Sequence, residues 1–346
     1  MSRTALSSLR EGYIAGLLSG KKSLREMVST GLIGMSLSHS CRLMQKAAPD
    51  TWRERISAAP AGGYLAVDFV KVKHEGNRIE GVDRQYSSQG MIWGHRLLSS
   101  GLVYSDGRDP YLLALEGTVS RRHASEQYPY LSASEAMLGV AGDIASTGYA
   151  LKGVVVDAEF ITRLSLRSLV HLTVGVIGRF KGNNNVRYQG QISKARDLAK
   201  QFPPGRARYY RKLKCYAKRL TVSLAQVGLV ELIIVWFAHA KRAGWKLCLL
   251  VSTLKDHGLQ ALIKAFKSRW GLEVSHRILK QNLALVHCQC LRFLAQRHHA
   301  DFCVSALLRI RNIRQINPSL SWKQAQKLAA LDATNALLTA ISPPPT

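Results

Sequence analysis

The stretch GVVVDAEF, residues 153–160, is a short and almost wholly apolar run that carries the acid Asp157 near its end. A run of this length and composition is typical of a strand that is buried on both faces of a sheet. Helical segments flank it. SASEAMLGVAGDIAST (132–147) precedes it with serines suited to cap a helix, and another helical segment follows to about Val170. This order of helix, buried strand and helix predicts an α/β protein.

Three further β-like segments lie upstream of this strand. The segment YLAVDFVKV (64–72) is rich in β-forming residues and has an alternating pattern. GMIWGHRLLSSGLVYS (90–105) fits a second strand or a pair, and YLLALEGTV (111–119) fits a third. More β-rich runs occur between about 172 and 253, and the pattern is helical from His257 onward. Three strands, a helix and a buried fourth strand predict a mixed α/β sheet flanked by helices.

The pattern of residues 1–60 predicts helices, and the break Pro60-Ala-Gly-Gly63 separates them from the first strand. Ser23 and Ser36 are suited to cap two short helices around the turn GLIG, which is the pattern of a helix-turn-helix. The alternative interpretation is a plain helical bundle. If the segment reads DNA, the side chains on its second helix are Ser38, His39 and Arg42.

The charge of the chain is strongly unbalanced. It has 49 lysines and arginines against 22 acids, a formal charge of +27, distributed along the whole sequence of 346 residues. Such an excess repels itself in a compact protein, and a polyanion relieves the repulsion. Phosphate backbones are the usual polyanion, with counterion release supplying affinity. Ribosomal and membrane-surface proteins share this charge, but its even spread favours a long nucleic-acid track.

The six cysteines do not make a disulfide framework in a chain this long, and the N-terminus lacks the apolar core of a signal peptide. The most apolar run, GLVELIIVWFAHA (228–240), is too short for a helical span and contains Glu231, so a buried strand is the better interpretation. We therefore expect a cytoplasmic protein, associated with nucleoid DNA and not with a membrane.

Two acids occupy unusual places. Asp68 lies inside the β run YLAVDFV and Asp157 closes another, although acids are depleted from strands and costly to bury. Either acid taken alone can be explained as a strand-end acid that is held by hydrogen bonds. Together with Glu273, which has Arg269 one helical turn before it and Arg277 one turn after, they suit a metal cage. Carboxylates that gather at one point repel, and Mg²⁺ neutralises them while it keeps positions for water and phosphate.

The segment F266-K-S-R269-W-G-L-E273-V-S-H-R-I-L-K280 resembles the Y-x2-R-x3-E-x6-K signature of bacterial insertion-sequence transposases of the IS-four type. Phe266 replaces the tyrosine, while the other positions match. VDFVKVKHEG and EGVDRQYSSQG (80–90) look like the first-acid region of that family, and GVVVDAEF looks like its second. GRFKGNNNV (178–186) resembles its basic segment, and HCQCLRFLAQRHHA (287–300) resembles a stretch of some members. The likeness covers about residues 64–310.

The resemblance implies a ribonuclease-H-like catalytic domain, 61–310, with a β-rich insertion at about 182–253. The segments 1–60 and 311–346 are then helical ends, the first suited to binding DNA ends. It also implies cut-and-paste transposition, often through a hairpin intermediate, at the terminal inverted repeats of a mobile element and a target DNA. Partners are double-stranded DNA and a second copy in a homodimer.

The same resemblance assigns roles to residues. Asp68, Asp157 and Glu273 are the expected catalytic and metal-binding residues, and two Mg²⁺ or Mn²⁺ ions are the expected cofactor. The residues expected to contact DNA are Phe266, Arg269, Arg277, Lys280, Lys181 and Asn183. Glu159 is the strongest substitute ligand among the other acids.

Alternatives stay open. A stand-alone nuclease or resolvase of the same fold needs the same acids, and an inactive DNA-binding remnant needs none of them. A zinc site is conceivable in the group His287, Cys288, Cys290, His298 and His299. However, Cys-x-Cys is not the usual zinc spacing, so packed, reduced cysteines are the preferred interpretation.

Overall fold

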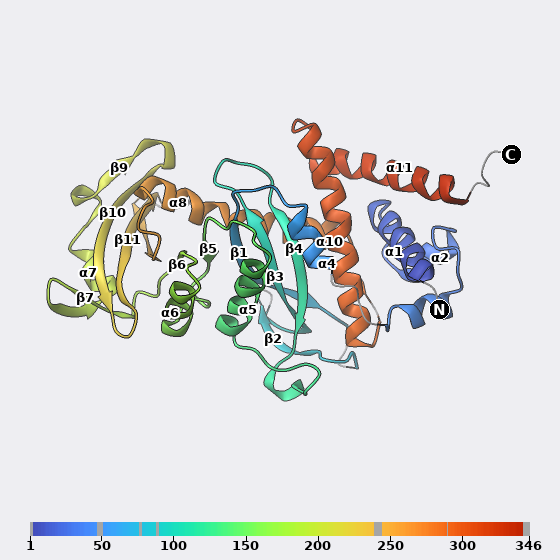
Figure 1. The fold of residues 1–346 in the computed structure, drawn as a ribbon, viewed down its shortest axis with the longest axis horizontal. Coiled ribbons are helices and arrows are strands. Elements are labelled where there is room, and N and C mark those ends of the chain that lie inside the picture. Colours follow the sequence, from blue (N-terminus) through green and yellow to red (C-terminus); the bar gives the residue numbers. More distant parts are fainter. Residues whose placement is uncertain are drawn as a thin grey trace.

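The computed structural model describes residues 3–46, 51–75, 78–87, 90–238, 244–288 and 290–341. Within this part of the chain, twelve strands form one mixed sheet that runs through the molecule, and helices cover both of its faces (Figure 1). The predicted mixed α/β architecture flanked by helices is confirmed.

Five strands form the centre of the sheet in the order β4-β3-β1-β5-β6. β1, β5 and β6 run parallel, while β3 is antiparallel to both β1 and β4. Because β1, β5 and β6 are parallel, their carboxyl ends lie at the same edge of the sheet. These strands are β1 (Tyr64–Lys73), β3 (Gly90–Val103), β4 (Tyr111–Thr118), β5 (Val154–Val156) and β6 (Val176–Arg179).

The β-rich segment at about 182–253 extends this same sheet and does not form a separate one. β12 pairs antiparallel with β6, and β11 and β10 follow outward as a long hairpin. Its strands are β7 (Asn185–Tyr188), β8 (Gln191–Lys194), β9 (Arg208–Tyr210), β10 (Cys215–Leu224), β11 (Gly228–Ala238) and β12 (Trp245–Ser252), with α7 (Ala195–Lys200) among them. β11 agrees with the buried strand predicted at 228–240, although 239–240 lie outside the described residues.

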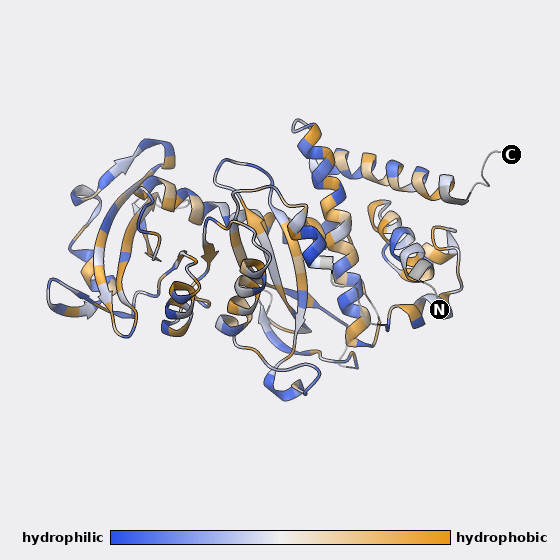
Figure 2. Cartoon of the chain, viewed as in Figure 1, coloured by the Kyte–Doolittle hydropathy of each residue, from blue (hydrophilic) through white to orange (hydrophobic). Residues whose placement is uncertain are grey.

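Two apolar clusters lie on opposite faces of the sheet, and the apolar colouring of the central strands in Figure 2 marks where they meet it. One face packs against α8 (Leu259–Ser268), α9 (Trp270–Asn282) and α10 (Phe293–Ile316). The other packs against α4 (Thr51–Ser57), α5 (Ala133–Ser146) and α6 (Arg163–His171). Of the two serines suited to cap this helix, Ser132 and Ser134, the structure uses Ser132, which forms a complete capping box with Glu135.

The N-terminal helices are α1 (Arg3–Leu18), α2 (Leu24–Ser29) and α3 (Leu37–Leu43), and α1 packs between α10 and α11 (Trp322–Ile341). Ser23 and Ser36 cap α2 and α3 as expected. On α3 the proposed reading residues Ser38 and Arg42 are exposed, and His39 is half-buried.

The structure also differs from the expected pattern in several places. The helix predicted without a break from His257 divides at Arg269 into α8 and α9. The boundary expected at 310 falls inside α10. Elements that the sequence did not suggest are β2 (Asp83–Ser87), the β7–β8 hairpin, α7 and the short 3₁₀ turns Arg121–His123, Pro204–Arg206 and Arg211–Leu213. The Pro-rich tail, 342–346, lies outside the described residues.

Two glycines seat α9 on the sheet. A Cβ at Gly101 of β3 would stand 3.1 Å from a methyl group of Leu272, so the missing side chain lets α9 approach the strand closely. One residue earlier in the helix, Gly271 packs against the ring of Pro110. Leu272 is completely buried, and its neighbour Glu273 is therefore held at the surface of the sheet.

Truncating this contact should destabilise the protein. We expect Leu272→Ala to lower the free energy of unfolding by about 2–5 kcal/mol, because a buried leucine is replaced by a cavity. The matched control is Trp270→Ala, whose side chain is 60% exposed two residues away and should cost roughly 0.5 kcal/mol or less. Urea denaturation measures both, and equal losses would contradict this account of how α9 is seated.

Candidate functional site

Asp68 and Asp157 occupy equivalent positions on neighbouring parallel strands. The last paired residues of β1 and β5 are Val67 and Val156, and each acid follows directly. Paired strands lie about 4.8 Å apart, and residues that lie side by side on two neighbouring strands point to the same face. Each carboxylate accepts a hydrogen bond at 2.8 Å from the backbone N–H of the next residue, Phe69 or Ala158. The sheet thus brings together two acids that are 89 positions apart in the sequence.

Arg269 connects the third acid to the first. Its Nη1 donates to Asp68 Oδ2 at 2.9 Å, and its Nη2 donates to Glu273 Oε1 at 2.8 Å. Arg269 stands at the junction of α8 and α9, so Glu273 lies in the first turn of the second helix. The intrahelical ion pair expected between Arg269 and Glu273 is present, and the same guanidinium also reaches β1. The arginine side chain is only 13% exposed.

Electrostatics show that the acids form one cluster. Burial raises the pKa of Asp68 above its ordinary value; the Arg269 guanidinium opposes this rise, and the charge of Asp157 adds to it. Burial likewise raises the pKa of Glu273, again opposed by Arg269 and increased by the charges of Asp68 and Asp157. Mutual repulsion between carboxylates disfavours their ionised forms. A further cation at this point would relieve that repulsion.

In the described residues, no group of three or more His, Cys, Asp or Glu side chains stands in metal-holding geometry. Arg269 lies between Asp68 and Glu273 and takes up the oxygens Oδ2 and Oε1. The donors are carboxylates whose ionised forms are disfavoured by burial and by one another. A hard divalent cation prefers such oxygen ligands. Metal binding through Oδ2 of Asp68 and Oε1 of Glu273 would require these oxygens to exchange the guanidinium for the ion.

Cations gather near the acids. Lys280, two turns after Glu273, is half-buried, and burial lowers the pKa of its ammonium, helped by the charge of Lys71 on β1. The sequence argument missed Lys71, although a lysine three residues after a strand aspartate was a visible signal. Arg277 is exposed on the same helix. Phe266, in contrast, packs partly buried against the apolar cluster beneath α8.

Lys181 and Asn183 are exposed in the turn that follows β6. β6 pairs in parallel with β5, with Gly178 opposite Val156, so this turn leaves the sheet at the edge that carries Asp157. A Cβ at Gly178 would come within 2.6 Å of Ile161, and the glycine therefore lets the segment after Asp157 close over β6. The basic turn and the second acid are thus neighbours along one edge of the sheet.

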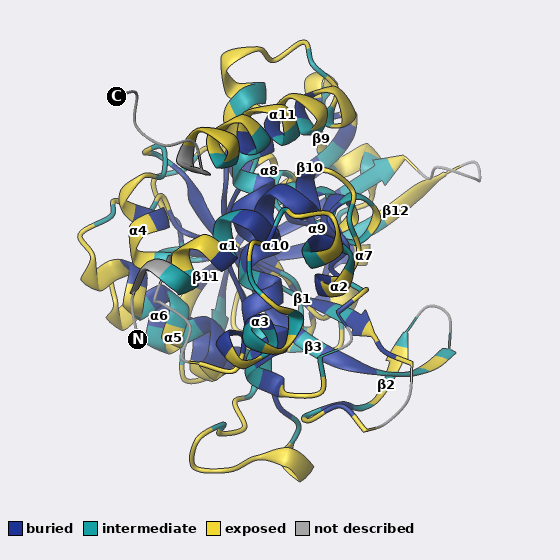
Figure 3. Cartoon of the chain, turned by 90° about the vertical axis from the view of Figure 1, so that its right-hand side faces the viewer, coloured by how far each residue is buried: buried dark blue, intermediate teal, exposed yellow. Residues whose placement is uncertain are grey.

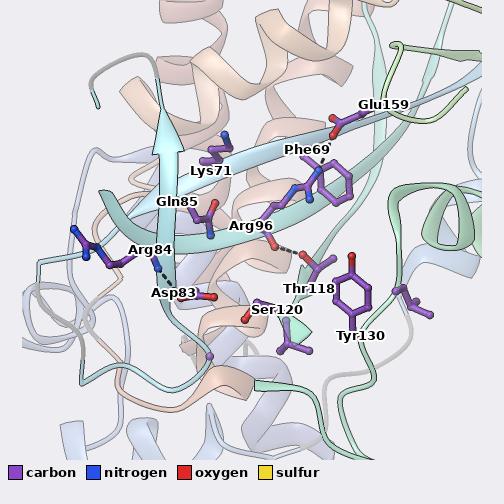
Figure 4. A pocket seen from close by; sticks show the side chains of 13 residues that line it. Phe69, Lys71, Asp83, Arg84, Gln85, Arg96, Thr118, Ser120, Tyr130 and Glu159 are labelled. Carbon is purple, nitrogen blue, oxygen red and sulfur yellow. Dashed lines mark hydrogen bonds and ion pairs between the residues drawn. The ribbon is translucent and has the colours of Figure 1, made fainter. Parts of the chain in front are cut away.

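Glu159, the substitute ligand considered from the sequence, has a different partner. It forms an ion pair of 2.7 Å with Arg96 of β3, and the Arg96 guanidinium lies 3.4 Å from the centre of the Phe69 ring (Figure 4). Burial raises the pKa of Glu159, an effect that Arg96 opposes and that the charges of Asp68 and Asp157 increase. These side chains line a cavity of about 520 Å³, also bordered by Lys71, and Phe69, Lys71 and Arg96 lie on the face of the sheet opposite to Asp68.

The cysteine and histidine group shows no metal-binding arrangement among the described residues, which exclude Gln289. His299 is buried with its Nδ1 2.8 Å from the hydroxyl of Tyr13 and its Nε2 3.0 Å from the carbonyl oxygen of Ala284. Burial lowers the pKa of His299 to about 4, so the ring is neutral. Gln296 binds the carbonyl oxygens of Cys288 and Cys290. The group holds the chain between α9 and α10 in place.

Comparison with solved structures finds a likeness to the piggyBac transposase in its synaptic complex with hairpin DNA. The TM-score is 0.51 at 11% sequence identity, over 100% of this chain and 74% of that one. The fold is similar to that of a transposase. No protein-family model matches the sequence, and no curated protein matches it. No helix in the described residues is long and apolar enough to cross a membrane.

Replacing the shared arginine should change the titration of two acids. We expect Arg269→Gln to raise the pKa of both Asp68 and Glu273, because the guanidinium now lowers both. Carboxyl ¹³C chemical shifts followed through a pH titration measure this. Arg277→Gln removes the same charge one turn beyond Glu273 and should leave both values in place. Equal shifts in the two variants would show a general field effect and no specific contact.

Proposed function

We propose that this protein is a DNA transposase that cuts and rejoins DNA strands by metal-dependent chemistry at Asp68, Asp157 and Glu273. The observation that carries the proposal is the convergence of these acids: two lie side by side on parallel strands, and Arg269 links the first to the third. Composition supports a DNA substrate, since a formal charge of +27 needs a polyanion to relieve it.

The three carboxylates are the residues that would hold two Mg²⁺ or Mn²⁺ ions. Divalent ions held by carboxylates supply activation of an attacking hydroxyl or water and stabilisation of the leaving oxygen. Arg269 keeps the acids together in the absence of a metal. Once released, its guanidinium lies beside the acids and is suited to bind a phosphate of the strand that is cut.

The cations around the acids would position the DNA. Burial and the charge of Lys71 lower the pKa of Lys280, and a phosphate bound at Lys280 would favour its charged form. Lys181 and Asn183 continue the polar surface along the edge of the sheet, with Arg277 on the exposed side of α9. We assign DNA contacts to these residues. Phe266 is partly buried, so a DNA contact through this side chain requires that it become exposed in the complex.

The fold and the signature residues support the finer assignment. The five central strands are proposed to be a ribonuclease-H-like core, and the spacing of Arg269, Glu273 and Lys280 favours an insertion-sequence transposase of the IS-four type. The piggyBac relative in fold was solved with hairpin DNA, which supports DNA as the ligand here. Terminal inverted repeats, target DNA and a homodimer complete the proposal. A stand-alone nuclease shares the acids but needs no strand joining.

Loss of one acid should separate chemistry from binding. We expect Asp68→Asn to abolish cleavage of supercoiled DNA in Mg²⁺ or Mn²⁺ while DNA affinity stays the same or rises slightly, because a negative charge is removed from a basic surface. Nicking and gel-shift assays on the same preparation measure both. Glu159→Gln is the matched control and should still cleave, since Glu159 is paired with Arg96. Cleavage by Asp68→Asn at the wild-type rate would remove Asp68 from the site.

Lys280 should distinguish a transposase from a simple nuclease. A transposase must hold the liberated 3′-hydroxyl for a second in-line attack, so positioning contributes much of its catalysis. We expect Lys280→Ala to reduce the salt dependence of non-specific binding by about one phosphate contact, roughly 0.9 in slope, but to lose strand joining.

Arg277→Ala removes an equal charge from the exposed side of the same helix and should keep joining. Labelled element ends, assayed separately for nicking and joining, measure the difference. Parallel loss of joining in both variants would reduce Lys280 to a simple backbone contact.

A further inference from the structure

A two-stranded ribbon extends the acid-bearing part of the sheet. β2 pairs antiparallel with the first residues of β3, from Asp83 opposite Gly94 to Ser87 opposite Gly90. Figure 3 shows this ribbon projecting from the body of the molecule. Lys71 ties it to β1, with its Nζ donating to the carbonyl oxygen of Tyr86 at 2.5 Å. The ribbon is therefore a fixed extension of the strand that carries Asp68.

One face of the ribbon continues the face of the sheet on which the acids lie. Side chains alternate between faces along a strand, and directly opposite residues share a face. Ser99 of β3 pairs with Asp68, so every second residue back along β3 points to the same side. That series reaches Trp93 and Met91, whose partners on β2 are Arg84 and Tyr86. All four ribbon side chains thus belong to the acid face.

These side chains lack a partner surface in the described fold. Tyr86 is 73% exposed and Met91 55% exposed, and the two lie opposite each other on the ribbon. Arg84 is exposed as well, with its guanidinium 5.9 Å from the centre of the Trp93 ring. Large apolar side chains and a cation at the end of a projecting ribbon indicate a surface that is covered by a ligand.

The dimensions and chemistry of this face fit duplex DNA. The major groove is about 12 Å wide and admits a two-stranded β-ribbon, in which an arginine can bind a guanine edge and apolar groups can contact thymine methyl groups. A duplex cut at the acids would pass Lys280 on the same face and continue along the ribbon. The minor groove, about 6 Å wide, admits two strands only when the DNA is bent and the groove is widened.

We propose that the β2–β3 ribbon enters the major groove of the duplex beside the cleavage site and reads base edges through Arg84, Tyr86 and Met91. This inference rests on the proposed function in that DNA is the ligand. It adds a recognition element that lies outside the helical signature and outside the N-terminal helices. Sequence specificity would then come in part from the catalytic sheet itself.

The test compares two duplexes of identical sequence, one with cytosine and one with glucosylated 5-hydroxymethylcytosine, which fills the major groove and leaves the phosphates unchanged. Binding is measured by fluorescence anisotropy in EDTA with the Asp68→Asn variant, so it does not depend on the cleavage chemistry. We expect the glucosylated duplex to bind about tenfold more weakly, the size of one good base contact. Arg84→Ala/Tyr86→Ala in the same background should bind both duplexes equally.

The matched control is Arg167→Ala/Val170→Ala, which removes one exposed cation and one exposed apolar side chain from α6 on the other face. It should keep the full discrimination between the duplexes. Met91→Ala is a second ribbon variant and should lose part of it. Equal binding of both duplexes by the parent protein, or sensitivity only to a minor-groove drug, would overturn the ribbon assignment. Failure of cleavage alone would affect the proposed function and not this inference.

Discussion

The ion pairs of Arg269 join a strand and a helix whose residues are 201 positions apart. One guanidinium binds Asp68 on β1 and Glu273 on α9, and it is nearly enclosed when it does so. A buried cation of this kind is tolerated only if its donors are satisfied, so the distance between β1 and α9 is tightly constrained. Gly101 permits the close approach from the strand side, because a Cβ there would stand 3.1 Å from a methyl group of Leu272, which would have to shift by a few tenths of an ångström.

The acids keep an unfavourable electrostatic energy even with this partner. The pKa values of Asp68 and Glu273 are raised although Arg269 lowers both, so burial and repulsion together exceed the attraction of one shared cation. Raised folded-state pKa values mean that these two groups favour folding most when protonated and oppose it as the pH rises through those values. At neutral pH they therefore reduce the stability of the fold, which is expected of groups held together for a function.

Local sequence patterns predicted individual strands and helices well, but they predicted much less about how these elements are arranged. GVVVDAEF predicted a strand because an apolar run of that length leaves few other possibilities, and Ser132 or Ser134 predicted the start of α5 as candidate caps. The register that places Asp157 beside Asp68 depends on pairing between distant strands, and no local pattern encodes it. β2 was missed because DRQYS is polar and its exposed residues face no core. The junction at Arg269 was missed because Arg269 itself has helical backbone angles, so the helical pattern of the sequence continues from α8 into α9.

The charge distribution argues against a purely structural role for the cluster. With 49 basic side chains available, a folded protein can neutralise three acids separately, as Arg96 does for Glu159 and Arg314 does for Asp109. Instead, Asp68 and Glu273 share one arginine, and Asp157 adds its charge to both. Burial lowers the pKa of Lys280, and the charge of Lys71 lowers it further. The acids and the lysines thus each keep a charge that no neighbour neutralises fully, and a phosphodiester with divalent ions is the partner that we propose for both.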